Sequence, residues 1–401
     1  MFHCVFNRDR DSYQIPLALA ENGLLESFVT DYYYREPIKI QSLKHRNAAG
    51  LKDSKTLNTY RAILAQTSWR IDSKLRRGTG ILSEIAVDSY IDRKFGKVAS
   101  RTNADLFAYS GYASCFAEPE FKNRKKILFQ YHPAPLFIYN VIKSNIRKST
   151  INNMALEPEV ANFETLFKRN FLESHSSDQI LCASTITKLS LLEIGIPSDK
   201  ITVIPYGFSE FHGKAKESHS HFRLIFVGSG GYRKGLQILL DSFDMNFRNH
   251  PVSLTIISRE IDPEIKFPAN PKIEFIPGLS RADLRELMQN SDILVLPSLV
   301  EGYGLVINEA LSAGCHVVAS EFTGLRDLML PEVLGTQIEG EITTESIAKS
   351  LTKAMEELSM NRDKVFFEAK RLCQERSWTN YRKRVVEFAQ FEKQSDEDKH
   401  Q

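Results

Sequence analysis

Residues 293–320, ILVLPSLVEGYGLVINEALSAGCHVVAS, contain the pattern that decides the fold. Ile293–Leu296 is a short apolar run that predicts a buried strand, and Leu305–Ala313 has the apolar spacing of a helix. A second apolar run, Val317–Ala319, predicts a further strand after the helix. A helix between two such strands is typical of a parallel sheet, whose ligands bind at the carboxyl ends of the strands. The loop between the first strand and the helix lies at such an end.

Two glutamates in this stretch, Glu301 and Glu309, are separated by seven residues. We expect Glu301 in the loop at the end of the strand and Glu309 on the helix that follows. A carboxylate accepts two hydroxyl hydrogen bonds at once, so the pair suits a ribose diol and a sugar ring. A solvated helix carboxylate is the alternative for Glu309. The loop amides that we expect to face phosphate or sugar oxygens belong to Gly302, Tyr303, Gly304 and Leu305.

An upstream stretch, FVGSGGYRKGL at residues 226–236, runs from an apolar strand into a glycine-rich turn and then a helix. Glycines let the backbone approach a ligand closely, and their N–H groups together with a helix N terminus favour an anion. Arg233 and Lys234 add two cations, which suit a diphosphate because Arg offers a planar fork and Lys a point charge. A purely structural turn is the alternative. The turn residues expected at the ligand are Gly228, Ser229 and Gly230.

Short apolar runs alternate with helical patterns through both halves of the chain, and this rhythm predicts parallel sheets with crossover helices. A chain of 401 residues suggests two domains. Residues 205–220 are rich in Gly, Pro, Ser and His and lack periodicity, so we expect domains at 1–205 and 206–375. The expected strands are Phe2–Phe6, Leu25–Thr30, Asp105–Tyr109, Lys126–Tyr131, Gln179–Ala183 and Ile201–Ile204, then Leu224–Val227, Leu254–Ile257, Ile273–Phe275, Ile293–Leu296 and Val317–Ala319.

Composition and charge exclude several classes of protein. The five cysteines are odd in number and scattered, with no CxxC pair, which argues against a zinc site or a disulfide framework. Neither a signal peptide nor an apolar run long enough to cross a membrane is recognisable, so we expect a cytoplasmic protein. Residues 1–200 hold 28 Lys and Arg against 21 Asp and Glu. This excess fits an anionic acceptor or peripheral association with the inner face of a membrane, and ordinary solvated surface is the alternative.

The first half offers two further candidates. In ILFQYHPAP, residues 127–135, His132 stands at the end of an expected strand. A histidine satisfied by the local backbone is the alternative interpretation. In the loop FHCVFNRDRDSYQ, residues 2–14, Arg8 and Arg10 supply positive charge, and we expect them to contact an anionic acceptor.

The two glutamate and glycine-rich motifs resemble those of a known family. EGYGLVINEALSAGCHVVAS, residues 301–320, is similar to the E-x7-E donor-site motif of the retaining family 4 glycosyltransferases, and FVGSGGYRKGL resembles their strand-and-RKG phosphate motif. DQILCAS and ITVIPYGFSEF, at 178–184 and 201–211, resemble the family's passage at the interdomain hinge. The resemblance implies the α/β GT-B fold, in which two Rossmann-like domains face each other across a donor-binding cleft. It also implies a terminal segment, 376–401, whose helix packs back on the first domain ahead of a polar tail.

The resemblance assigns roles to single residues. It implies that Arg233 and Lys234 hold the diphosphate of a nucleotide-sugar donor and stabilise its departing charge. Glu309 would bind the ribose hydroxyls, and Glu301 would contact the transferred sugar. The position of His132 resembles that of a histidine that reaches the donor sugar near the reacting centre.

The chain also departs from the family pattern. Many members have an arginine where this chain has Ser229, and they have glycines in the first loop, residues 2–14, where this chain has none. A bound metal is not needed to explain the site, so we expect neither a metal ion nor a cofactor. The family precedent implies retention of anomeric configuration and an acceptor that is a glycan or a lipid-linked saccharide, with no nucleic acid as partner.

Two other interpretations stay open. One is a different enzyme on the same architecture, such as a sugar-nucleotide epimerase or a phosphorylase, against which the combination of RKG and E-x7-E speaks. The other is a catalytically inactive scaffold that retains a nucleotide-sugar pocket. The complete set of two cations and two glutamates argues against such a loss of activity.

Overall fold

The structure is a computed structural model. It describes residues 1–7, 9, 11–34, 43–51, 55–58, 80–146, 160, 162–214 and 220–397.

The first half of the described chain forms a parallel sheet with the strand order β3-β2-β1-β4-β5-β6-β7. Every strand expected in this half is present, with ends that differ by one residue at most. β3 lies at the edge of the sheet and was not predicted from the sequence. An edge strand is less buried, so it can form without the apolar run that makes a central strand recognisable. The strands are β1 (Phe2–Val5), β2 (Leu25–Thr30), β3 (Thr56–Asn58), β4 (Asp105–Tyr109), β5 (Lys126–Gln130), β6 (Gln179–Cys182) and β7 (Ile201–Val203).

The second half forms a parallel sheet with the order β10-β9-β8-β11-β12-β13. The order reverses between β8 and β11, and such a switch point is where doubly wound sheets bind ligands. Both sequence motifs, residues 226–236 and 293–320, follow these two strands. β13 is again an unexpected edge strand. The strands are β8 (Phe222–Val227), β9 (Val252–Ile257), β10 (Ile273–Ile276), β11 (Ile293–Leu296), β12 (His316–Ser320) and β13 (Gly335–Ile338).

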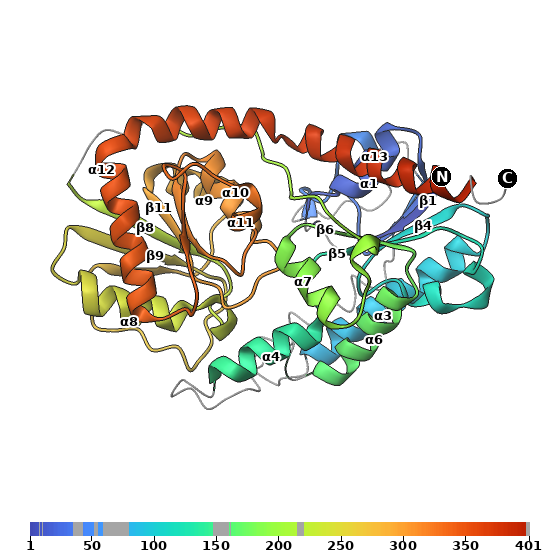
Figure 1. The fold of residues 1–401 in the computed structure, drawn as a ribbon, viewed down its shortest axis with the longest axis horizontal. Coiled ribbons are helices and arrows are strands. Elements are labelled where there is room, and N and C mark those ends of the chain that lie inside the picture. The colour runs from blue at the N-terminus through green and yellow to red at the C-terminus, as the bar shows by residue number, and fades with distance from the viewer. Residues whose placement is uncertain are drawn as a thin grey trace.

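Helices cover both sheets (Figure 1). In the first half, α1 and α13 lie on one side of the sheet and α3 and α6 on the other. The helices of the first half are α1 (Gln14–Glu21), α3 (Gly80–Ala99), α4 (Pro135–Ile146), α6 (Phe163–His175) and α7 (Thr185–Glu193). Those that follow are α8 (Leu236–Phe247), α9 (Arg281–Asn290), α10 (Leu305–Ser312), α11 (Leu325–Leu328), α12 (Thr344–Glu375) and α13 (Trp378–Glu397).

The chain crosses between the two sheets twice, and the two crossings pair with each other. Phe208 N–H donates to Arg376 O at 2.8 Å, and Trp378 N–H donates to Phe208 O at 3.1 Å. α12 bends at Asn361, and its second part and α13 run across both lobes in Figure 1. α13 lies on α1, where Arg382 donates to Glu21.

The carboxyl ends of the two sheets meet at Gly302. A Cβ atom at this position would lie 2.2 Å from Tyr131 O and 3.2 Å from the Cα atom of His132. Gly302 follows β11 in the second half, whereas Tyr131 and His132 follow β5 in the first. Only glycine permits this approach, so the absence of a side chain at residue 302 sets how closely the two halves pack.

We predict that Gly302→Ala lowers the free energy of unfolding by about 1–3 kcal/mol, because the added methyl group overpacks the contact with Tyr131. Chemical denaturation of the ligand-free protein measures this loss. Gly228→Ala is the matched control, since a Cβ there would meet Phe226 at 3.7 Å, an ordinary contact distance. Equal stability of the two variants would contradict the close approach.

Candidate active site

The turn after β8 is locked against the segment after β11. Tyr232–Lys234 forms a single 3-10 turn, and Gly235 follows it with φ +70°. A Cβ at Gly235 would lie 2.1 Å from Pro297 O, so both the backbone angle and the packing require glycine. Leu299 N–H donates to Arg233 O at 2.8 Å. The two sequence motifs are therefore held as one unit, which directs the two cations at the loop that contains Glu301.

The side chains of Arg233, Lys234 and Glu301 converge in the structure. Lys234 Nζ donates to Glu301 Oε2, and Arg233 Nη1 lies 3.5 Å from the same oxygen. Arg233 Nη1 also donates to Val300 O at 3.0 Å. The three side chains are 8–14% exposed. Two cations share one carboxylate at a largely buried position, which leaves a net positive charge where a bound anion would interact strongly.

The glycine N–H groups of the first turn are used by the protein itself. Gly228 N–H donates to Ile257 O at 3.1 Å, and Gly230 N–H donates to Glu260 O at 3.0 Å. The expectation that these amides face an anion is therefore wrong. The two hydrogen bonds attach the turn to the strand β9 and the residues that follow it, so the glycines shape the turn while the neighbouring cations supply the positive charge.

A cavity of about 400 Å³ opens beside this turn. Gly228 and the exposed Ser229 line it on the β8 side. Its other polar side chains come from the loop after β9, which the sequence analysis did not select. Their position directly after the strand predicted at Leu254–Ile257 was the signal that could have found them. These residues are Ser258, Arg259 and Glu260.

Glu309 lines a second cavity, of about 200 Å³. Leu284 of α9 borders both cavities, so the two adjoin along this helix. Desolvation by the surrounding protein raises the pKa of Glu309, and the guanidinium groups of Arg281 and Arg285 oppose the shift. The structure thus separates the two motif glutamates: Glu301 pairs with the RKG cations, whereas Glu309 faces arginines of α9 that sequence reasoning missed.

The second cavity also reaches the first half of the chain. Its lining includes Asp11 and Ser12 from the loop after β1. Arg281 Nη2 donates to Asp9 Oδ2 of the same loop at 3.1 Å. Arg8 and Arg10, the expected acceptor contacts, lie outside the described residues. The loop nevertheless borders the cavity that contains Glu309, so both halves contribute to the site.

This loop has left-handed backbone without glycine. Ser12 and Tyr13 have φ values of +54° and +61°, in a region that L-residues occupy at some cost. Burial raises the pKa of the adjacent Asp11 to about 6, although the Tyr109 hydroxyl donates to its Oδ2 at 2.6 Å. The family glycines are missing from the sequence here, yet the backbone keeps a conformation that glycine would adopt freely.

His132 lies beside the loop that contains Glu301. Its Cα is within 3.2 Å of a Cβ built at Gly302, the residue after Glu301. Gln130 Nε2 donates to His132 O at 2.7 Å and so fixes the backbone of the segment after β5. The His132 ring centroid lies 4.6 Å from that of Tyr131. The structure therefore brings His132 from the first sheet to the loop of Glu301 from the second.

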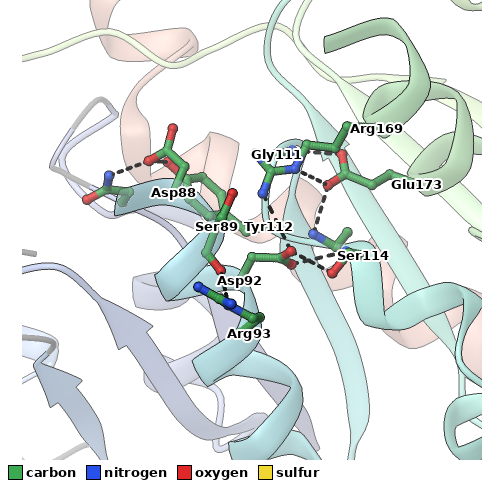
Figure 2. Close-up of polar contacts among 11 residues, drawn as sticks. Asp88, Ser89, Asp92, Arg93, Gly111, Tyr112, Ser114, Arg169 and Glu173 are labelled. Carbon is green, nitrogen blue, oxygen red and sulfur yellow. Dashed lines mark hydrogen bonds and ion pairs between the residues drawn. The ribbon is translucent and has the colours of Figure 1, made fainter. Parts of the chain in front are cut away.

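A carboxylate network holds the loop after β4, at the switch point of the first sheet (Figure 2). Glu173 of α6 accepts from Gly111 N–H at 2.7 Å and from Ala113 N–H at 3.0 Å. Asp92 of α3 accepts from Ser114 N–H at 3.1 Å, and Arg169 lies between the two carboxylates. This network fixes the loop after β4, which lies at the same edge of the first sheet as the loop after β1. We call this edge the rim of the first half.

A second part of the same rim is tied through Asp88 of α3 (Figure 2). Asp88 Oδ1 accepts from Asn7 Nδ2 and from the Tyr112 hydroxyl, each at 2.8 Å. Asn7 follows β1 and Tyr112 follows β4, so Asp88 connects the loops after the two central strands.

Glu173 gives this rim a pH dependence. Burial raises its pKa to about 7 from an ordinary 4.5, although Arg169 and the two backbone donors oppose the shift. The folded state therefore holds the Glu173 proton more tightly than the unfolded state, and stability falls as pH rises from about 4.5 to about 7. The loss is on the order of 3 kcal/mol, since each pH unit across such a window corresponds to about 1.4 kcal/mol.

We predict that Glu173→Gln removes this part of the pH dependence. Relative to the original protein, the variant should gain stability as pH rises from 4.5 to 7, measured by denaturant unfolding at each pH. Glu193→Gln, at an exposed position on α7, controls for the loss of a carboxylate. Unfolding curves of Glu173→Gln that stay parallel to those of the original protein would contradict the raised pKa.

The described residues contain neither a cluster of metal ligands nor a membrane-spanning helix. No group of three or more His, Cys, Asp or Glu side chains in this part of the chain is placed to hold a metal ion. Among the described helices, none combines the length and the apolar character needed to cross a bilayer. All five cysteines are buried.

The second half of the chain matches a known protein family. Residues 208–369 match the family model described as glycosyl transferases group 1. The matched region contains β8 to β13, and with them the RKG turn, both motif glutamates and the cavity beside the turn after β8.

Curated relatives that are named as glycosyltransferases match this chain over part of their length. An uncharacterised glycosyltransferase of Methanocaldococcus jannaschii, MJ1607, is 25% identical over 237 residues, which are 54% of this chain and 60% of that protein. The amylovoran biosynthesis glycosyltransferase AmsK of Erwinia amylovora is 23% identical over 217 residues, 48% of this chain and 52% of AmsK. The chain spans about half the length of the curated relatives it matches.

Solved structures match over nearly the whole chain. Anabaena HepE, solved with UDP and glucose, has a TM-score of 0.60 at 14% identity and covers 97% of this chain and 99% of its own. Sucrose-phosphate synthase of Thermosynechococcus elongatus has a TM-score of 0.64 at 14% identity and covers 99% of both chains. At such identities the likeness concerns the fold. Residues 208–369 are therefore similar to the glycosyl transferases group 1, and the two parallel sheets together form the GT-B fold.

Proposed function

We propose that this protein transfers a sugar from a nucleotide-sugar donor to a hydroxyl group of a glycan or a lipid-linked saccharide, with retention of anomeric configuration. One observation carries the proposal: Arg233 and Lys234 converge on Glu301, and the next residue, Gly302, touches the segment of His132 from the other sheet. Cations, an acid and a histidine from two facing halves thus surround one place.

The cations suit the departing diphosphate. When the bond between the anomeric carbon and the diphosphate oxygen breaks, negative charge builds on that oxygen. Preorganised cations in a largely buried site stabilise such charge by several kcal/mol. Arg233 and Lys234 would supply this stabilisation, and their pairing with Glu301 holds them in place before the donor binds.

The bonding changes need no protein nucleophile. The acceptor hydroxyl oxygen forms a bond to the anomeric carbon on the face from which the diphosphate leaves, and the hydroxyl proton passes to the departing phosphate oxygen. We propose Glu301 and His132 as groups that contact the transferred sugar, and Glu309 as the ligand of the ribose hydroxyls in the cavity that it lines. No metal ion takes part in this scheme, and neither does a cofactor.

The partners follow from the same comparison. HepE was solved with UDP and with UDP-glucose, which supports a nucleotide-sugar donor here and makes UDP-sugars the first to test. AmsK is named for the biosynthesis of a polysaccharide, which supports a saccharide acceptor. The basic first half supports peripheral contact with an anionic membrane face that carries such an acceptor. A cytoplasmic location is proposed on the same grounds.

The test is a panel of UDP-, GDP- and ADP-sugars. We predict that one nucleotide class raises the melting temperature and releases its nucleoside diphosphate with a saccharide acceptor. Lys234→Ala should lower this release by a factor on the order of 100 or more, as the loss of a preorganised donor of charge does, while the fold remains intact. Lys353→Ala, at an exposed lysine of α12, is the matched control and should keep full activity.

The outcomes separate the alternatives. Full turnover by Lys234→Ala would contradict the assignment of the RKG cations. Donor binding with no turnover across a set of acceptors would favour the scaffold, and epimerised sugar in the absence of an acceptor would favour the epimerase. NMR analysis of the product's anomeric proton tests retention.

A further inference from the structure

Three buried hydroxyl groups lie along the start of α7, at the edge of the first sheet that faces the donor-site loop. They belong to Ser184, Thr187 and Ser190, and all three residues are fully buried. Ser184 caps the helix by accepting from Thr187 N–H at 3.2 Å. Spacings of three residues place these hydroxyls on one face of the helix. None of them belongs to the set of site residues described above.

Two of these hydroxyls bind the donor-site loop. Ser184 Oγ donates to Gly302 O, and Thr187 Oγ1 donates to the same oxygen at 3.2 Å. Gly302 directly follows Glu301, and its N–H donates to Glu301 Oε1 at 3.2 Å. One peptide unit of the second half is therefore held by two side chains of the first half, and it is the unit next to the acid paired with the RKG cations.

A carboxylate of the second half grips the same helix terminus. Asp327 of α11 accepts from Thr185 N–H with both carboxylate oxygens, at 3.0 and 3.1 Å, and also from the Thr185 hydroxyl. A carboxylate at a helix N terminus is favourable, because it accepts from unpaired N–H groups and opposes the helix dipole. Here the carboxylate comes from the other half of the molecule.

The segments of Gly302 and Asp327 are held together as one unit by backbone hydrogen bonds. Glu301 N–H donates to Phe322 O at 3.0 Å, and Gly324 N–H donates to Tyr303 O at 2.7 Å. The turn at 322–324 leads directly into α11. The N-terminal turn of α7 thus contacts this unit at two points, one on the donor-site loop and one on the helix after it.

The third hydroxyl connects α7 to the segment of His132. Ser190 Oγ accepts from Ala134 N–H at 2.8 Å and donates to Thr187 O at 2.7 Å. One helix therefore holds the backbone on both sides of the site, at Ala134 in the first half and at Gly302 in the second.

We propose that the start of α7 is a positioning element for transfer: Ser184, Thr187 and Asp327 hold the Glu301 loop in place against His132. The inference rests on the proposed function for its catalytic part. The three residues do not touch the reacting atoms, and they act through the peptide of Gly302 and through α11. Without these bonds Glu301 and His132 would lie out of register, and a misplacement of about 1 Å can cost on the order of 100-fold in rate.

The experiment compares turnover with donor affinity. In the double variant Ser184→Ala/Thr187→Val, we expect kcat to fall by a factor on the order of 10 to 100, with a donor Kd by calorimetry that stays within about threefold. The single variant Thr187→Ser keeps the hydroxyl, so it should keep most of the kcat of the original protein. Asp327→Ala should lower kcat as the double variant does, whereas Asp327→Asn, which keeps one acceptor oxygen, should lower it less.

Hydrogen exchange and a surface control complete the design. Asp327→Ala should speed exchange at the Thr185 amide, which reports the contact without any need for activity. Ser359→Ala removes a hydroxyl that bonds only to its own helix, at Met355 O, and should leave both readouts unchanged.

Three results would overturn the proposal. The first is an unchanged kcat in the double variant. The second is an equal fall of kcat, donor affinity and stability, which would indicate a merely structural role. The third is Thr185 exchange that stays unaltered in Asp327→Ala. A native protein that turns over no sugar nucleotide would instead refute the proposed function, and the exchange measurement would still judge the contact.

Discussion

The rest of the structure depends on the close approach of two backbones at Gly302. Two parallel sheets can face each other at many separations, and side chains at their carboxyl ends would normally keep them apart. Here the backbone of the second half reaches Tyr131 O and the Cα of His132 because residue 302 has no side chain. The approach brings the loop of Glu301 within reach of groups from both sheets, so that a single site can draw on the whole chain.

Electrostatics then divides the site into two parts. Glu301 compensates one of the two RKG charges, which lets two cations remain together at a largely buried position without a ligand. A buried charge costs free energy unless it is paired, so the carboxylate stabilises the empty site and leaves positive charge for an anion. Glu309 faces Arg281 and Arg285 in the adjoining cavity. The E-x7-E spacing therefore places one acid beside Arg233 and Lys234 and the other on α10, in the adjoining cavity.

Sequence patterns were sufficient for the sheets and for the central motifs, and insufficient for what depends on contacts between distant loops. Strands buried on both faces have continuous apolar runs, so β1, β8 and β11 were predictable, whereas the short edge strands β3 and β13 were not. Arg233, Lys234 and Glu301 were each selected from the sequence, and the structure brings their two loops together at one switch point. The N–H groups of Gly228 and Gly230 were predicted to face a ligand, but β9 and the residues after it use them, and no local pattern reveals that partner. Asp327, Ser184 and Thr187 were missed for the same reason, since their partners are 115 to 142 residues away.

The contacts between the two halves fall into two groups. Phe208 is hydrogen-bonded to both Arg376 and Trp378, so the two covalent connections form one paired strip. Asn308 of α10 donates to Gly207 O at 2.9 Å and attaches this strip to the second half, while Arg382 of α13 attaches the chain beyond it to Glu21. Away from this strip, the two halves touch at Gly302, at the start of α7 and between Arg281 and Asp9. The peptide beside Glu301 is itself one of these contacts, so the position of that acid depends on how the two halves pack against each other.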